Sequence, residues 1–219
     1  VVMAVPDAKI GEISRNVVPM MKGDAIMILP DPSAAYAGEI ALRDDCTFVI
    51  THPCHPALFG EQDTPEARKD FFGGIAKQDI VIALLHGREE NFEKAKQVCI
   101  EMFDPVVKCH RITVEQMVIL EPIAAEVVAG SAVSLIKEAF DEAVGCGVPK
   151  DAARAFMLGH IQILLAILFG EVSHQISDAA KIAIESGYNR VFRPDWKEVF
   201  KPEVIREIVN VMLHREENT

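Results

Sequence analysis

The amino-acid sequence predicts an α/β domain with a partial Rossmann sheet, followed by an all-helical domain. Short apolar strands alternate with helix-forming segments up to Ile112, a pattern typical of a mostly parallel sheet covered by helices. From Thr113 onward, apolar residues recur at helical spacing and no strand-forming segment follows. The expected boundaries are therefore 1–112 for the sheet domain and 113–219 for the helical domain.

Each element of the sheet domain follows from its local pattern. Short apolar runs predict buried strands at 1–5, 25–29, 47–50, 80–85 and 106–112. Apolar residues at helical spacing predict helices at 10–21 and 89–102. A further helix is expected to begin at Thr64-Pro65-Glu66, because threonine is a good N-cap and proline suits the first helical position.

The helical domain is delimited by capping residues. Thr113 and Gln116 have the spacing of a capping box, which predicts a helix that runs to Val144 with a kink at Pro122. Gly145-Cys146-Gly147 is expected to end that helix. Three more helices are expected, one from Pro149 to about Phe169, one capped by Ser177-Asp178, and one opened by Pro202.

Composition narrows the class of protein. The net charge of −11 over 219 residues, without a long basic run, argues against a nucleic-acid binder and against docking on anionic membranes. The five cysteines form no Cys-x-x-Cys pair, which favours reduced thiols in the cytoplasm over a disulfide framework. The most apolar stretch, 161–169, is shorter than the ~20 residues needed to span a bilayer. We expect it to form core or a homodimer interface, because it has no polar face to present to water.

No Gly-rich phosphate-binding turn is present. A dinucleotide-binding domain normally opens with a strand, a Gly-x-Gly-x-x-Gly turn and a helix, and no such turn precedes a helix here. Val1–Val5 is therefore expected to be about the fourth strand of such a domain, with the front half absent. Binding of NAD or NADP by these residues is then expected to be weak or absent. The alternative is a complete small α/β domain that never had this turn.

Five segments together resemble the 6-phosphogluconate-dehydrogenase-like oxidoreductases, with the D-apionate oxidoisomerase type as the nearest group. The segments are Val2-Met3-Ala4-Val5-Pro6-Asp7, Thr51-His52-Pro53-Cys54-His55-Pro56, Asp70-Phe71-Phe72-Gly73-Gly74, Arg111-Ile112-Thr113-Val114-Glu115-Gln116-Met117 and Leu158-Gly159-His160. The resemblance implies a homodimeric enzyme that oxidises a sugar acid with NAD and couples this to a ketol-type rearrangement. It also implies cofactor contacts at Val5, Pro6 and Asp7.

A more distant similarity is to ketol-acid reductoisomerase, and here the departures matter. The position of that family's magnesium-binding aspartate falls on Arg111, and two further acidic ligand positions fall on Met157 and Ile161. The two-magnesium site is therefore not carried over, and no metal ligand is assigned. The catalytic lysine of β-hydroxyacid dehydrogenases has no match either, because Lys137 lies too close to the end of its helix.

His52 and His55 are the first catalytic candidates. They lie in a proline-bounded loop expected at the carboxyl end of a strand, where open α/β sheets bind ligands. A histidine there can take a hydroxyl proton during hydride removal. Cys54 between them is a candidate substrate contact. Two alternatives remain open: both histidines could bond local backbone, or the His-x-x-His pair with Cys54 could bind a metal.

Glu115 is a catalytic candidate at the start of the helical domain, and its alternative role is to offset the helix dipole. Glu126 lies eleven residues on, nearly the same helical face at 3.6 residues per turn, so both could line one cleft. We predict that Glu126 contacts substrate. Gln116 is also assigned to substrate, because the resemblance matches it to a Gly-Glu-Gln segment of ketol-acid reductoisomerase.

Three further candidates complete the site. His160 lies in an apolar helix, where a histidine is usually structural, but it falls on the matching histidine of the reductoisomerase and is therefore a catalytic candidate. His110 and Arg111 end the last strand as candidate substrate contacts. Arg111 could hold a substrate carboxylate with its forked donors, or form a surface ion pair.

The leading hypothesis is thus an NAD-dependent oxidoreductase or oxidoisomerase of a sugar acid, inactive if the front half is missing. One alternative is a non-catalytic dimerisation or binding module that keeps only half a nucleotide site. Another is a metal-dependent isomerase that uses His52, Cys54 and His55.

Overall fold

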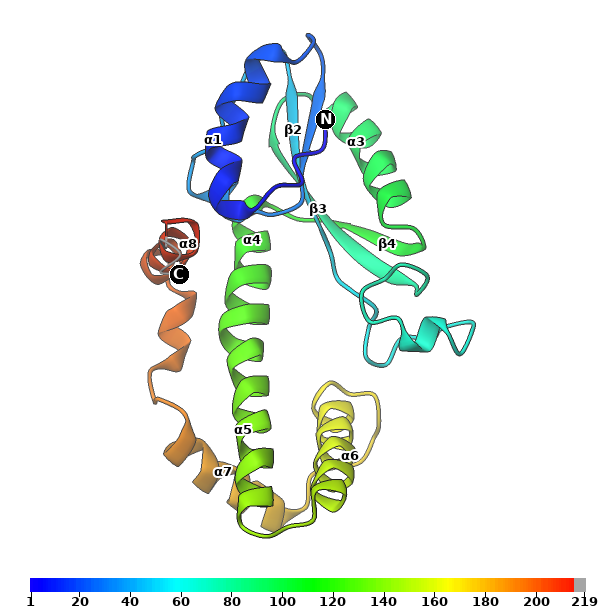
Figure 1. The fold of residues 1–219 in the computed structure, drawn as a ribbon, viewed down its shortest axis with the longest axis vertical. Helices are drawn as coiled ribbons and strands as arrows, with labels where there is room; N and C mark the ends of the chain where they lie inside the picture. The colour runs from blue at the N-terminus through cyan, green and yellow to red at the C-terminus, as the bar shows by residue number, and fades with distance from the viewer. Residues whose placement is uncertain (215–219) are drawn as a thin grey trace. The chain divides into compact units, whose positions relative to one another are not determined.

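A computed structural model describes residues 1–214 and divides the chain into two compact units (Figure 1). The first unit holds Val1–Ala124 and the segment from Phe200 onward, and the second holds Ala125–Val199. The helices that begin at Val114 and Pro202 therefore belong with the sheet, whereas the sequence places them in the helical domain.

The first unit contains a four-stranded sheet in the order β1-β2-β3-β4. Its strands are β1 (Ile26–Leu29), β2 (Thr47–Pro53), β3 (Gln78–His86) and β4 (Val106–Arg111). The β1–β2 and β3–β4 pairs are parallel, as expected of a mostly parallel sheet, but β2 and β3 are antiparallel, so the sheet is mixed.

The connection between β2 and β3 explains the antiparallel pair. A parallel return normally needs a crossover helix, and this connection forms only the short 3-10 turn η2 (Ala67–Lys69). Thr64 does act as a cap, since its hydroxyl accepts a hydrogen bond from the Ala67 amide at 3.1 Å. No α-helix continues from it, so the predicted helix at this position is wrong.

The N-terminal segment lies parallel beside β1 without forming a regular strand. Val2 makes an isolated bridge to Ile28, and the Met3 amide donates to the Ile28 carbonyl at 2.9 Å. The carboxyl ends of this segment, β1 and β2 therefore lie at the same edge of the sheet. Helix α1 (Asp7–Val17) and the turn η1 (Val18–Met20) follow.

Helices cover both faces of the sheet (Figure 1). Helix α3 (Glu89–Met102) packs on one face, and α1, α2 (Ser33–Tyr36) and α4 (Val114–Val118) lie on the other. Alternation along the strands separates the two faces. The buried core under α3 consists of Ile28, Val49, Ile80, Ile82, Phe92, Ala95 and Cys99.

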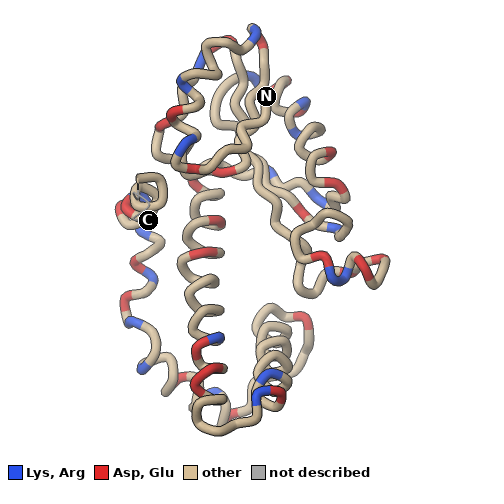
Figure 2. The backbone as a smooth tube through the Cα atoms, in the orientation of Figure 1, with Lys and Arg blue, Asp and Glu red and all other residues tan. Residues whose placement is uncertain are grey.

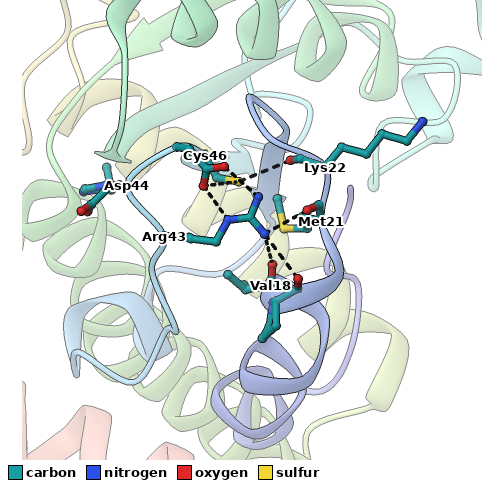
Figure 3. Close-up of polar contacts among 9 residues, drawn as sticks. Val18, Met21, Lys22, Arg43, Asp44 and Cys46 are labelled. Carbon is teal, nitrogen blue, oxygen red and sulfur yellow. Dashed lines mark hydrogen bonds and ion pairs between the residues drawn. The ribbon is translucent and has the colours of Figure 1, made fainter.

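Arg43 fastens the end of α1 to the loop before β2, as Figure 3 shows. Its guanidinium donates to the carbonyls of Val18 and Met21, each at 2.9 Å, and it pairs with Asp45. The Val18 carbonyl also accepts from the Met21 amide at 3.2 Å, so the guanidinium adds a second donor there and a side-chain donor to the Met21 carbonyl beyond the end of η1. The hydrogen bond from Arg43 lowers the pKa of Asp45, which keeps the pair ionised.

Helix α8 (Pro202–His214) packs back on the sheet unit through α1 and α2. Its buried side chains recur every fourth residue along one face of the helix, at Ile205, Val209 and Leu213. His214 also contacts Glu39, with 2.7 Å between Nε2 and Oε1. The last described helix thus completes the core of the first unit.

The helices of the second unit begin and end close to the predicted residues. They are the π-helical segment η3 (Ile119–Gly130), which starts in the first unit, α5 (Ser131–Gly145), α6 (Lys150–Leu168), α7 (Asp178–Val191) and the 3-10 turn η4 (Trp196–Phe200). Pro122 lies inside η3, so the helix leaves α geometry at the predicted position. Ser177 caps α7 by accepting from the Ala180 amide at 3.3 Å.

The second unit has almost no interior of its own. Among its residues, all of which the structure describes, only Ala153 and Ala166 are buried. Two helical runs, Val114–Gly145 and Lys150–Leu168, are long and apolar enough to cross a membrane by length and composition. The expectation that no apolar stretch is long enough to span a bilayer considered 161–169 alone, and it therefore underestimated the length of these apolar helices.

Candidate active site

His52 lies inside β2, one residue before the strand ends, and not in a loop as expected. It pairs with Val81 of β3, and its Nδ1 lies 2.9 Å from the carbonyl oxygen of Pro30, which follows β1. A carbonyl oxygen only accepts, so Nδ1 carries the proton and Nε2 of the neutral ring keeps its lone pair. The Pro30 carbonyl, at the edge where the carboxyl ends of the N-terminal segment, β1 and β2 meet, thus orients His52 as a base.

His55 lies just beyond the strand in a left-handed backbone conformation, with φ 60°. Its Nδ1 is 3.2 Å from the Phe72 carbonyl oxygen, and its ring packs edge-on against Phe72 at 5.9 Å between centroids. The rings of His52 and His55 are 6.4 Å apart. The two histidines therefore do lie together, and both also bond backbone carbonyls, at residues distant in the chain and not locally as the alternative role states.

Asp70 shapes the loop that holds His55. Its carboxylate accepts hydrogen bonds from the amides of Phe72, Gly73, Ile75 and Ala76. These bonds hold the pKa of Asp70 far below its usual range, because they stabilise the ionised form. The loop is thereby fixed around a charge while the side chain of Phe72 remains 83% exposed.

His110 lies on the same face of the sheet as His52. Val81 is paired with His52 on one side and with His110 on the other, so the three residues form one row. His110 Nε2 is 2.7 Å from Asp79 Oδ2 at the start of β3. The sequence reasoning missed Asp79, although an acidic residue at the head of an otherwise apolar strand was a signal to examine it.

Cys54 sits at the edge of this row, where its amide donates to the Asp79 carbonyl at 2.9 Å. Burial, then the charge of Asp79, raise the pKa of the Cys54 thiol. The thiol therefore stays protonated at neutral pH, which does not suit a nucleophile. Within residues 1–214, no three His, Cys, Asp or Glu side chains come together as a metal site.

Arg111 lies on the other face of β4, under α3. Its guanidinium donates to both carboxylate oxygens of Glu89 and lies 4.1 Å from the centroid of the Phe92 ring. The hydrogen bond from Arg111 lowers the pKa of Glu89. Since neighbouring residues of a strand point to opposite faces, Arg111 points away from the face of His110. The ion-pair alternative describes this residue, and the structure gives no support for a substrate grip.

Glu115 and Gln116 lie in the first turn of α4. This helix packs against β3, on the face of the sheet to which His110 of β4 also points. Gln116 completes the predicted capping box, accepting from the Thr113 amide at 2.9 Å, while Thr113 accepts from the Gln116 amide at 3.2 Å. Hydrogen bonds to its own backbone and to Thr113 lower the pKa of Glu115. Its exposed carboxylate is therefore an acceptor and not an acid.

Glu126 and His160 belong to the second unit. The expected shared face of Glu115 and Glu126 assumed 3.6 residues per turn, and the π-helical segment between them breaks that period. His160 is exposed and not buried in a core, with Nδ1 2.8 Å from the Phe156 carbonyl oxygen and its ring stacked on Phe156. The first unit therefore holds the cluster of His52, His55 and His110 by itself.

The residues predicted to contact the cofactor lie together at the start of α1. Val5, Pro6 and Asp7 end the N-terminal segment and begin α1, at the carboxyl-end edge shared with His52. In open α/β sheets with helices on both faces, ligands such as nicotinamide dinucleotides bind off the carboxyl ends of the strands. Nicotinamide-dependent oxidoreductases are therefore the class that the fold and the position of the site define.

Comparison with known proteins gives the particular family. The chain belongs to the D-apionate oxidoisomerase family, and its residues 60–213 match the phosphogluconate dehydrogenase (decarboxylating) C-terminal domain. It is 43% identical over 206 residues to the D-apionate oxidoisomerase of Rhizobium rhizogenes, covering 94% of this chain and 75% of that protein. The enzyme of Blautia hydrogenotrophica is 43% identical over 217 residues, covering 98% and 76%. The resemblance inferred from the five segments is confirmed.

Solved structures confirm the fold. A semialdehyde dehydrogenase NAD-binding protein from Cupriavidus necator, solved in complex with calcium and NAD, matches with a TM-score of 0.93 and 41% identity, covering 96% of this chain and 77% of that one. A ketol-acid reductoisomerase from an uncultured archaeon shares the fold at a TM-score of 0.66 and 18% identity, covering 98% and 64%. The predicted partial Rossmann sheet with a phosphogluconate-dehydrogenase-like helical part is thus confirmed, with the antiparallel β2–β3 pair as the correction.

Proposed function

We propose that the protein oxidises a sugar acid with NAD and couples the oxidation to an isomerisation, as the names of its relatives state for them. One observation carries the proposal for this chain. His52 is held by the Pro30 carbonyl at the edge where three parallel strand ends meet, with Nε2 as its available base. An alcohol that gives up a hydride must also lose its hydroxyl proton, and a fixed imidazole is suited to take it.

The residues present fit one end of NAD. Pro6 is the N-cap of α1 and makes no side-chain cap hydrogen bond, so the start of this helix lies beside the strand edge without a capping side chain. Val5, Pro6 and Asp7 would hold the nicotinamide end there, next to His52. No Gly-rich turn for the pyrophosphate exists among the 219 residues, so the fit is to that end only. When bound, NAD supplies the acceptor for the hydride.

The chain's own groups then divide the work. His52 takes the hydroxyl proton, and His55, fixed beside it by Phe72, orients the substrate. Glu115 stays ionised and accepts hydrogen bonds from substrate hydroxyls, with Cys54 and Gln116 as further proposed contacts. No metal is assigned a role. A cytoplasmic location is proposed with this chemistry, because all five cysteines are free thiols.

A homodimer is proposed as the functional form. Large apolar side chains of the second unit are exposed along α5, α6 and α7: Val133, Leu135, Phe156, Leu158, Ile163, Leu168, Ile182, Ile184 and Tyr188. A patch of this extent needs cover, and the family match favours an enzyme assembly over a membrane as that cover. A second copy of the same unit has a surface of matching chemistry.

The test is an assay of the complete gene product with NAD and D-apionate, which follows NADH formation. We expect His52→Gln to reduce turnover at least ~100-fold, the usual size of an acid–base contribution. His86→Gln, at the far end of β3, is the matched control and should keep wild-type turnover. No NADH from any sugar acid, or unchanged turnover of a folded His52→Gln protein, would contradict the proposal.

A further inference from the structure

We propose that Asp79 and His110 form a second proton-transfer pair on the sheet face of His52, which serves the isomerisation half of the reaction. This inference rests on the proposed function, because it assigns a base to the step that follows oxidation. His110 would contact the substrate, and Asp79 would act through it as a positioning residue.

The contacts fix how His110 can act. Asp79 Oδ2 lies 2.7 Å from His110 Nε2, and an ionised carboxylate only accepts hydrogen bonds. Nε2 therefore carries the proton, and Nδ1 of the neutral ring keeps its lone pair. The two side chains are 37% and 36% exposed, so the pair is accessible to a small molecule without being fully solvated. A carboxylate behind an imidazole holds one tautomer and stabilises the imidazolium that forms when a proton arrives.

The spacing of the row suits a small substrate. His52 and His110 are two strands apart through Val81, which puts their backbones about 10 Å apart at usual strand separations. Both side chains rise from the same face, and α4 packs on β3 above it. A short-chain sugar acid placed between His52 and His110 would meet one imidazole from each side. Val81, half-buried between them, would form the floor.

The coupled reaction needs two hydroxyl protons moved at different carbons. In the oxidation, the alcohol carbon loses a hydride to NAD and its oxygen loses a proton to His52, which leaves a ketone. In the isomerisation, Nδ1 of His110 takes the proton of the hydroxyl on the adjacent carbon. The bond from that carbon to one substituent shifts to the ketone carbon, so the adjacent oxygen becomes the new carbonyl. The former ketone oxygen then receives the proton back from His110, and no electrons are gained or lost.

Other polar groups near the row are less suited to this role. Hydrogen bonds lower the pKa of Glu115. A carboxylate with a lowered pKa takes up a proton less readily, so Glu115 is a weak base. The Cys54 thiol is protonated. Arg111 lies under the other face and is paired with Glu89. His110 is the group on this face with both an oriented lone pair and a carboxylate to stabilise its charged form.

The first experiment measures coupling in the complete gene product. Wild-type protein should form NADH and isomerised product in equal amounts. In His110→Gln, isomerised product should fall at least ~100-fold while NADH still forms, so the unisomerised keto acid accumulates. Asp79→Asn should shift the ratio in the same direction. Asp44→Asn is the matched control, because Asp44 contacts His86 at 3.7 Å outside the row, and its ratio should stay at one.

A second readout does not depend on turnover. Nitrogen-15 NMR of labelled histidines should show His110 with its proton on Nε2, and Asp79→Ala, which removes the acceptor, should change that tautomer while leaving His52 on Nδ1. Equal amounts of NADH and isomerised product in a folded His110→Gln protein would overturn the inference but leave the proposed function intact. A His110 tautomer that stays the same in Asp79→Ala would also overturn it. No NADH from the wild type would instead count against the proposed function.

Discussion

The two units of this chain are similarly apolar in sequence but dispose of their apolar side chains in opposite ways. In the sheet unit, Phe48, Ile50 and Ile82 are completely buried between the sheet and its helices. In the helical unit the only buried residues are two alanines, and Phe156, Leu158 and Phe169 of or beside α6 face outward. The sheet unit therefore has its own core, whereas most of the apolar side chains of the helical unit remain exposed on its surface.

Charged residues occur in both units, but in the helical unit they are unevenly placed (Figure 2). Acidic and basic side chains are spread over the helices and loops of the sheet unit, and the interior strands carry few. On the helical unit, long stretches of α6 carry no charge between Arg154 and Glu171. A surface without charge is what a permanent interface between subunits requires, because charged groups are costly to bury there.

The largest expected effect separates the two kinds of apolar residue. Phe48→Ala should lower the free energy of unfolding by about 3–5 kcal/mol, because it leaves a cavity in a closed core. Leu158→Ala, at a half-exposed position, should cost less than about 1 kcal/mol in dilute protein. Urea unfolding at two protein concentrations measures both. The Phe48→Ala loss should not change with concentration, and equal losses for both variants in dilute protein would contradict the comparison.

The next prediction tests what the helical surface is for. A cavity of about 540 Å³ lies within the second unit between η3–α5 and α7–η4, lined by side chains that include Val128, Leu135, Tyr188 and Phe192. Phe192→Asp should raise the dimer dissociation constant at least ~30-fold, the effect of losing about 2 kcal/mol at a central aromatic contact.

Light scattering across a dilution series measures this constant, and circular dichroism checks that the variant remains helical. Asn189→Asp, exposed on α7 three residues before Phe192, adds the same charge outside the cavity and should leave the proposed dimer unchanged. A wild-type protein that is monomeric in buffer and partitions into lipid vesicles would show that the apolar helices serve a membrane and not a second copy.

The sequence was sufficient wherever one local interaction decides the structure. Thr113 and Gln116 form the capping box, Ser177 caps α7, and Pro149 and Pro202 mark the starts of α6 and α8. Each of these depends on residues within one helical turn. The family resemblance was also readable, because its motifs are short, contiguous segments.

The sequence was insufficient where the outcome depends on partners distant in the chain. The direction of β3 depends on whether residues 54–77 form a crossover helix, which the Thr64 cap alone could not decide. Arg111 was read as a substrate contact because Glu89 and Phe92 are far from it in sequence. Asp79 became visible only when strand pairing brought it to His110. Periodicity failed for Glu126 because a π-helical segment intervenes.

The smallest expected effect compares one glycine from each unit. Gly87 ends β3 with φ 105°, and a Cβ there would lie 2.6 Å from Thr47 Oγ1 and 2.8 Å from the Cys46 carbonyl oxygen. Gly87→Ala should therefore lower the free energy of unfolding by about 1–3 kcal/mol. Gly159 lies within α6 with no atom of the described chain near its Cβ position, so Gly159→Ala should stabilise the helix by up to about 1 kcal/mol.

The sign of the Gly159→Ala effect also sharpens the comparison between the units. In dilute, monomeric protein only helix propensity acts, so thermal unfolding should show a gain. At higher concentrations, where the proposed dimer would form, a loss would place Gly159 at a close approach between subunits, because an added methyl group would then meet the partner's backbone. A gain at both concentrations would place Gly159 outside the interface. A loss in the monomer would contradict the open surface that distinguishes the helical unit from the sheet unit.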